Sequence, residues 1–373
     1  MGFREHAARV RRILGIVLAV LLLGGVAAAL VVGGDQDDSG TATKTVRGVI
    51  GSEKAEFFAD PEVVKALAAR GLTVRTETSG SWDMEQLPLK GYDFAFPSAK
   101  APADELRTRT KVTAAPLRPF YSPLVVVAHS AAAKVLAGNG LATLGAGGRT
   151  GTLQMGAYLA AARDDRTWQQ LKGSAGHPEL SGTLFITSTD PVASNSGALY
   201  LAAASYVADG GRVAGDQAAV ERTAPLLRKL IQVQGAQQSS SDAPFRDFVS
   251  GVGNPLVLVY ESQVAAQLLA RQEMGDLVVL YPDTTVNSDH TLVPLTEAGR
   301  TLGELLSSDP ELRKLAVRHG FRPQGAAAEF TAATAGHTGY LNQTLGGVRQ
   351  APVPTSKVLH AMALKARDQG GTA

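Results

Sequence analysis

Beyond residue 44, short runs of apolar and β-branched residues alternate with segments of helical periodicity. The runs predict strands at residues 45–50, 72–76, 92–96, 123–129, 183–188, 256–260, 277–281 and 291–295. Asp60-Pro61 and Asp309-Pro310 each place an N-cap residue before a proline in the first helical position, so they predict helix starts. Residues 55–70 carry one apolar face, as an amphipathic helix does. This alternation predicts an α/β architecture with mostly parallel sheets.

Three stretches depart from the alternating pattern. Residues 138–153 and 235–244 are rich in glycine or serine and are predicted to be surface loops. From Gly325 onward the chain is rich in alanine, glycine and threonine, with one helical pattern at residues 356–367. Residues 326–373 are therefore predicted to be a C-terminal extension of the main fold.

The N-terminal segment has the pattern of a membrane anchor. Four arginines within residues 1–12 precede twenty uncharged apolar residues, 13–32, and three aspartates follow. At about 1.5 Å per residue, such a helix matches a hydrocarbon core about 30 Å thick. The positive-inside rule places residues 1–12 in the cytoplasm and everything beyond the linker at 33–44 outside the cell membrane. The apolar core of a cleaved signal is usually shorter, about 7–15 residues, so a retained single-pass anchor is favoured over cleavage near Ala27–Ala29.

Composition narrows the function classes. The chain is 45% hydrophobic and 19% charged, which fits a globular body with a large core. Its net charge is +2, but residues 1–12 contribute a local +3, so the remainder is close to −1. Without a basic excess, nucleic-acid binding is not expected. The absence of cysteine removes disulfides, thiolate nucleophiles, cysteine-ligated zinc and a lipoprotein anchor.

The sequence carries no motif that predicts catalysis. It contains no zinc-protease helix motif, no phosphate-binding loop and no nucleophile elbow. Ser130 and Lys134 are one residue too far apart for a serine–lysine pairing, and none of the seven histidines is spaced to share a metal with another. We therefore predict no enzymatic activity, no catalytic residue, no bound metal and no cofactor.

What recurs is a turn rich in small hydroxyl residues after a predicted strand. Such turns follow four strands, at Gly51-Ser52, Thr78-Ser79-Gly80-Ser81, Pro97-Ser98 and Ser194-Asn195-Ser196-Gly197. In open α/β sheets, ligands bind outside the carboxyl ends of strands. Free N–H groups at helix N-termini and hydroxyl groups can hold an anion without a formal counter-charge. Serine is also a common N-cap anywhere, so each turn alone fits an ordinary helix start.

Several blocks, in order, resemble the type II periplasmic solute-binding proteins, particularly the branch that binds molybdate, sulfate and phosphate. The blocks are VRGVIGSEKAEF from Val46, FYSPLVVV from Phe120, ITSTDP from Ile186, LVLVYES from Leu256 and the stretch from Leu305 that ends in HGFRP. The resemblance covers about residues 45–325. It implies ligand contacts at Ser52, Ser79, Ser81, Asn195, Ser196 and Tyr260, with a backbone contact from Gly253-Asn254.

The same resemblance implies an α/β fold of two lobes behind the N-terminal transmembrane helix. Lobe I would comprise residues 45–120 and 278–325, and lobe II residues 121–277. Such a protein captures a small anion or polar solute between the lobes and passes it to the permease of an ABC-type transporter.

Two other functions remain open. The same fold without a transport role could be a tethered sensor or a protein-interaction module, with a blocked or apolar cleft. An extracytoplasmic hydrolase would need a nucleophile within about 2.6–3.2 Å of a base, for instance around Ser196 or His290.

Overall fold

The computed structural model describes residues 43–368. Among these residues, no helix is both long enough and apolar enough to cross a membrane. The predicted anchor at residues 13–32 and most of the predicted linker lie outside the described residues.

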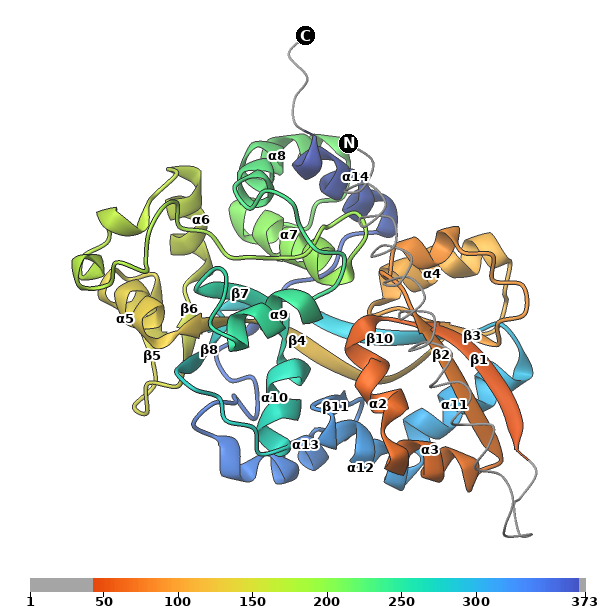
Figure 1. Cartoon of the computed structure of the whole chain (residues 1–373). Helices are drawn as coiled ribbons and strands as arrows, with labels where there is room; N and C mark the ends of the chain where they lie inside the picture. Colours follow the sequence, from red (N-terminus) through yellow and green to blue (C-terminus); the bar gives the residue numbers. More distant parts are fainter. Residues whose placement is uncertain (1–42, 369–373) are drawn as a thin grey trace, which may run out of the picture. The chain divides into compact units, whose positions relative to one another are not determined.

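A mixed sheet forms the centre of the fold (Figure 1). Its strands run in the order β2-β1-β3-β10-β4-β8-β6-β5, and β7 and β11 also pair with β4. These strands are β1 (Lys44–Ile50), β2 (Leu72–Thr78), β3 (Phe94–Phe96), β4 (Leu117–His129), β5 (Ala142–Leu144), β6 (Thr150–Leu153), β7 (Leu256–Tyr260), β8 (Leu277–Pro282), β10 (Asn287–Pro294) and β11 (Arg322–Pro323). A second, two-stranded sheet pairs β9 (Thr284–Thr285) with β12 (Arg349–Gln350).

The long strand β4 joins two halves of the large sheet. Its first part pairs with β10 and β11, and its second part pairs with β7 and β8. We call β1, β2, β3 and β10 with their helices the first half, and β5 to β8 with theirs the second half. The predicted preponderance of parallel pairing is wrong: in the described sheets β3–β10, β4–β10, β4–β11, β4–β7, β4–β8 and β5–β6 are antiparallel. The reason is that β4 and β10 pass between the halves and run antiparallel to most of the strands beside them.

The helices cover both halves of the sheet. The α-helices are α2 (Ala55–Ala59), α3 (Pro61–Ala68), α4 (Lys100–Thr110), α5 (Ser130–Gly138), α6 (Met155–Arg163), α7 (Asn195–Ala208), α8 (Gln217–Gln232), α9 (Asp242–Val249), α10 (Glu261–Leu269), α11 (Glu297–Ser308), α12 (Pro310–Arg318), α13 (Ala327–Ala333) and α14 (Ser356–Arg367). Short 3₁₀ helices occur at Ser52–Lys54, Asp83–Gln86, Trp168–Gln170, Ser174–Gly176 and Ala335–His337. The two predicted aspartate–proline starts are confirmed, because Asp60 caps α3 and Asp309 caps α12.

Two local predictions are wrong. Residues 183–188, predicted as a strand, form only isolated bridges at Thr183 and Thr187 and no strand. Their backbone turns away to lead into α7, so Leu184 and Ile186 are buried by packing and not by a ladder. Residues 138–153, predicted as a loop, include the hairpin β5–β6, whose second strand pairs with β8.

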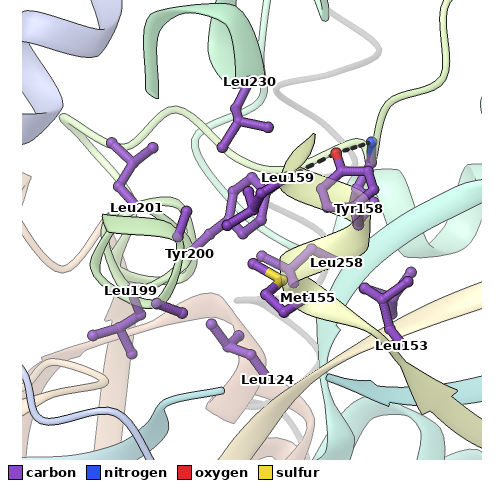
Figure 2. Packing of buried hydrophobic residues seen from close by; sticks show 14 of the residues in the cluster. Leu124, Leu153, Met155, Tyr158, Leu159, Leu199, Tyr200, Leu201, Leu230 and Leu258 are labelled. Carbon is purple, nitrogen blue, oxygen red and sulfur yellow. Dashed lines mark hydrogen bonds between the residues drawn. The ribbon is translucent and has the colours of Figure 1, made fainter. Parts of the chain in front are cut away.

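The apolar core is divided in the same way as the sheet. One set of buried residues packs α2, α3, α11 and α12 against the first half and includes Phe57, Phe94 and Leu302. In the second half a larger set surrounds α6, α7 and α8. Figure 2 shows Met155 and Leu159 of α6 against Tyr200 of α7 and Leu258 of β7. Tyr158 also accepts a hydrogen bond from the Ile186 amide at 3.1 Å, so the buried hydroxyl is satisfied.

The C-terminal segment packs against both halves. Its helix α14 lies against α7 and α8, where Leu359 and Met362 are buried (Figure 1). At the start of the same helix, the Ser356 hydroxyl donates to the Glu105 carboxylate of α4. The His360 ring lies 6.4 Å from that of Trp82, which follows β2. The C-terminal segment therefore contacts both halves, and we call it the strap.

Candidate functional site

Loops from both halves of the sheet converge on one cavity, which we call the serine cavity. The first half contributes the turns after β1, β2 and β3, and the second half contributes the start of α7, the loop before α9 and the end of β7. The lining residues are Gly51, Ser52, Glu53, Ser79, Gly80, Ser81, Ser98, Ser194, Asn195, Ser239, Ser240, Ser241 and Tyr260. The recurring serine turns thus meet at the carboxyl ends of β1, β2 and β3, where α/β proteins bind ligands.

The residues singled out from the sequence lie together. Five of the six, Ser52, Ser79, Ser81, Asn195 and Tyr260, line the serine cavity. The sixth, Ser196, is buried behind this lining, where its hydroxyl lies 2.7 Å from Thr189 Oγ1 and 3.2 Å from Ser194 Oγ. The Gly253-Asn254 pair does not lie here, because the Asn254 amide instead donates to the Phe185 carbonyl and Thr187 hydroxyl.

The start of α7 is buried and tightly packed. Gly197 is required there because a Cβ at this position would lie 2.3 Å from the Thr189 carbonyl oxygen. The Gly197 amide donates to Thr189 Oγ1 at 2.9 Å. The side-chain amide nitrogen of Asn195 donates to the hydroxyls of Tyr260 and Ser288 at 3.2 and 3.3 Å. Asn195 Oδ1 is buried and has no hydrogen-bond partner among the described residues, so this helix start retains an acceptor that no protein group satisfies.

The two halves touch across the serine cavity. The Trp82 amide donates to the Ala193 carbonyl at 3.2 Å, and a Cβ on Gly80 would lie 2.5 Å from that same oxygen. The Ser52 hydroxyl lies near enough to the Asp242 carboxylate of α9 to act against the rise in its pKa. The remaining cavity is about 10 Å³, room for about one water molecule. A solute can therefore enter only if the halves separate.

A buried ion cluster lies beneath the first turn: Glu53, Lys54, His290 and Ser98. Lys54 donates to the Glu53 carboxylate, and its Nζ lies 3.1 Å from Nδ1 of His290 and 3.3 Å from Ser98 Oγ. Ser98 donates to Glu53 at 2.5 Å. His290 Nδ1 also lies 3.4 Å from Glu53 Oε1, and His290 Nε2 is buried without a partner among residues 43–368.

Burial and mutual attraction set the charges in this cluster. Burial, together with the charge of Lys54, lowers the pKa of His290 to about 4, while Glu53 acts in the opposite direction. Burial alone would raise the pKa of the Glu53 carboxyl, but Lys54 and His290 outweigh it and hold that pKa well below its usual value. Glu53 is therefore a carboxylate at neutral pH, positioned at the edge of the cavity.

In the part of the chain that the structure describes, neither Ser196 nor His290 belongs to the pair of a nucleophile and a free base that a hydrolase would need. Ser196 contacts only other hydroxyls at the distances given above, and no base lies beside it in its described contacts. His290 Nδ1 is occupied by Lys54. Ser98 does donate to a carboxylate, but it is only 1% exposed in this closed arrangement of the halves.

Sequence reasoning missed part of the lining. Glu53 and Lys54 follow Ser52 directly, and two adjacent opposite charges at the end of a predicted strand could have indicated a functional site. The loop at residues 235–244, predicted only as surface, supplies Ser239, Ser240 and Ser241. Ser288, which donates to the Ser98 carbonyl and accepts from Asn195, had no local signal because it lies within β10.

A larger groove opens beside the serine cavity, and we call it the acidic groove. It has a volume of about 570 Å³ and shares Ser52 and Glu53 with the cavity. Its other walls are α2 with Asp60 and the end of α12 on one side, and α9 with α10 on the other. The lining includes Glu56, Asp60, Asp242, Phe245, Arg246, Ser262, Gln263, Ala266, Gln267, Leu269, Ala270, Gln272, Arg318 and His319.

The fold is that of the type II periplasmic binding proteins, as the sequence blocks predicted. The sulfate-binding protein SubI from Mycobacterium tuberculosis H37Rv matches 85% of this chain and 96% of its own, with a TM-score of 0.53 and 18% identity. Iron-bound HitA from Pseudomonas aeruginosa matches 88% and 99%, with a TM-score of 0.53 and 13% identity. A periplasmic thiamin binding protein matches 87% and 96%, with a TM-score of 0.53 and 11% identity.

Comparison by sequence adds no relative. No protein-family model matches the chain, and no curated protein matches it significantly. Identities of 11–18% to the solved structures show a shared two-lobed α/β fold.

Proposed function

We propose that this chain is an extracytoplasmic solute-binding protein that captures a small anion or polar solute between its two lobes. The observation that carries the proposal is the convergence of serine turns from both halves on one cavity. Beside this cavity is a buried helix start, where the side-chain oxygen of Asn195 has no partner among the described residues. When the halves separate, the cavity opens, and the hydroxyls of Ser52, Ser81 and Tyr260 can bond a solute and replace its hydration. Closure then strengthens these hydrogen bonds because the local dielectric falls.

The proposal includes a setting at the membrane. Residues 13–32 anchor the chain with its body outside the cell, and the loaded protein delivers its solute to the permease of an ABC-type transporter. The two halves of the sheet, joined by β4, serve as the two lobes. Proteins with this fold are described as binders of sulfate, thiamin and iron, which supports solute capture.

The test is thermal unfolding of the whole chain in mild detergent against oxyanions, sugars, amino acids and short peptides. A ligand that binds only the folded state, at a hundred times its Kd, adds about 2.7 kcal/mol to the free energy of unfolding. The stabilisation should be lost in Ser52→Ala and Ser81→Ala. Ser250→Ala, an exposed serine outside the cavity, is the matched control and should keep it.

A second function is favoured by one observation. The serine cavity is closed to about 10 Å³, and several of its hydroxyls already bond one another. A tethered sensor or protein-interaction module would have such a closed cleft. No stabilisation by any compound in the panel would reject solute capture and support this second function.

A further inference from the structure

The acidic groove has the size of a ligand site. Its volume of about 570 Å³ lies within the range of about 300–1,000 Å³ that small-molecule sites occupy. It lies between α2 and α10, which come from different halves of the sheet (Figure 1). Through Ser52 and Glu53 it is continuous with the serine cavity.

Carboxylates face one another across this groove without enough cations to balance them. Glu53 and Glu56 come from the segment after β1, and Asp242 comes from α9. Burial raises the pKa of the Asp242 carboxyl and the charge of Glu53 and Glu56 raises it further, while Ser52 and Arg246 act in the opposite direction. Mutual repulsion of this kind disfavours a bound anion and is relieved by a bound cation.

The other charged groups of the groove are largely committed to each other. Asp60 accepts from His319 Nε2 at 2.8 Å, and Arg318 pairs with Glu62 outside the lining. Glu53 is already paired with Lys54 in the buried ion cluster, so Arg246 is left opposite the carboxylates of Glu56 and Asp242.

An independent feature also indicates a missing polar partner. Ser262 is only 2% exposed and lines the groove, yet its Oγ has no hydrogen-bond partner among the described residues. Its backbone amide is already satisfied by Ser122 Oγ at 2.9 Å. A buried hydroxyl without a partner costs free energy, and a ligand donor or acceptor in the groove would satisfy it.

The lining distinguishes an organic cation from a metal ion. Among residues 43–368, no three acidic, histidine or cysteine side chains lie close enough to hold a metal. The wall from α10 is instead a mixture of amides and apolar side chains, with Gln263 and Gln267 beside Ala266 and Leu269. Amides can bond a polar group, and the apolar side chains can cover methylene groups.

We infer that the acidic groove binds an amine-bearing solute, whose ammonium or guanidinium group lies between Glu56 and Asp242 and whose aliphatic part lies along α10. This inference rests on the proposed function and specifies its solute: an organic cation in place of the small oxyanions that the sequence resemblance suggested.

The test is isothermal titration calorimetry on the whole chain at low ionic strength. The probes are 1,4-diaminobutane, L-arginine and L-lysine, and the neutral control is butane-1,4-diol, which has the same carbon chain as the diamine. Sodium sulfate, sodium phosphate and glucose complete the panel. We expect at least one amine to bind and the diol and oxyanions not to bind, with affinity falling as salt is added.

Variants locate the site. Asp242→Asn removes a charge-assisted hydrogen bond and should weaken amine binding about tenfold or more. Glu56→Gln changes an exposed residue and should weaken it a few-fold, an effect that salt reduces. Glu304→Gln, an exposed glutamate of α11 outside the groove, is the matched control and should leave affinity unchanged.

The outcomes separate the two proposals. Amine binding that survives Asp242→Asn and Glu56→Gln overturns the inference. Binding of an oxyanion or glucose, but no amine, also overturns it while supporting solute capture. If nothing binds, solute capture and the inference fail together.

Discussion

Arg322 is the cationic member of a fully buried ion pair that connects three parts of the chain. From β11 its Nε and Nη2 donate to the Glu261 carboxylate of α10 at 2.6 and 2.9 Å. The remaining N–H groups donate to the carbonyls of Asn342 and Gln343 in the C-terminal segment at 2.7 and 2.8 Å. The side chains of Arg322 and Glu261 are 2% and 0% exposed. Arg322→Met should therefore leave two carbonyls without donors and a buried, charged carboxylate with only the Tyr281 hydroxyl as a donor.

The expected cost follows from these contacts. Removing one member of a buried ion pair costs about 3–5 kcal/mol, and each carbonyl that finds no water adds about 1 kcal/mol. Methionine retains some of the apolar contact, so we expect a loss of about 5 kcal/mol in the free energy of unfolding. For a chain of this size, that corresponds to a fall in Tm of about 7 °C.

Urea unfolding followed by tryptophan fluorescence measures this loss, since Trp82 and Trp168 are both buried. Arg300→Met is the control, because its pair with Glu304 is half exposed and such pairs contribute at most about 0.5 kcal/mol. The double variant Glu261→Gln/Arg322→Met should recover much of the loss, since no uncompensated charge then stays buried.

The single variant also has a pH signature. Without its partner, the buried Glu261 carboxyl should acquire a raised pKa in the folded state. The folded state then binds a proton that the unfolded state has released, so stability falls as the pH rises above about 4.3. The deficit of Arg322→Met should therefore be smaller at pH 5 than at pH 8. A loss no larger than that of Arg300→Met, at any pH, would refute the reasoning.

Three further predictions concern the described core and the buried ion cluster. Because burial lowers the pKa of His290 to about 4, the unfolded state binds more protons below the ordinary histidine value of about 6.5, and stability should fall as the pH drops from about 6.5 to 4. Thermal melts across this range should show a flatter profile for His290→Gln, and equal profiles would contradict the assignment. Leu359→Ala in α14 should cost about 2–5 kcal/mol by urea unfolding, whereas Leu364→Ala, 50% exposed, should cost little; equal losses would mean that the strap is not packed. Gly320→Ala should cost more than about 1 kcal/mol, because φ is +79° and a Cβ would lie 2.1 Å from the Ser262 carbonyl oxygen; a melt like that of the unaltered chain would reject this geometry.

The sequence predicted elements best where the signal is local. Strand β7 was predicted with the bounds found, as was helix α14. These predictions succeeded because a β-branched run and a helical apolar face are properties of neighbouring residues. Residues 183–188 failed for the opposite reason, since whether an apolar run joins a ladder depends on which backbone lies beside it. The hairpin β5–β6 was missed because its glycines suppress strand propensity, while pairing with β8 stabilises it.

The site was predictable only in outline. Strand-end serines could be foreseen to gather, because strand ends share an edge of the sheet, and Ser52 and Tyr260 do line one cavity. The buried ion cluster could not be foreseen, since Lys54 and His290 are remote in sequence and meet only through the pairing of β10. Nor could the closure of the cavity be predicted, because it depends on how the two halves meet.

The course of β4 and β10 has a consequence for how the chain folds while it is being synthesised and exported. Strand β3 pairs with Val293 and Pro294 of β10, so the first half cannot complete its sheet until the whole of the second half has been synthesised. Long-range pairing of this kind slows folding and leaves strand edges exposed. Until β10 is available, the sheet of β1 to β3 therefore keeps an unpaired edge at β3, which can pair with an incorrect strand. A chaperone that protects nascent chains should matter most during this interval, and a chain truncated before β10 should aggregate instead of forming a stable half.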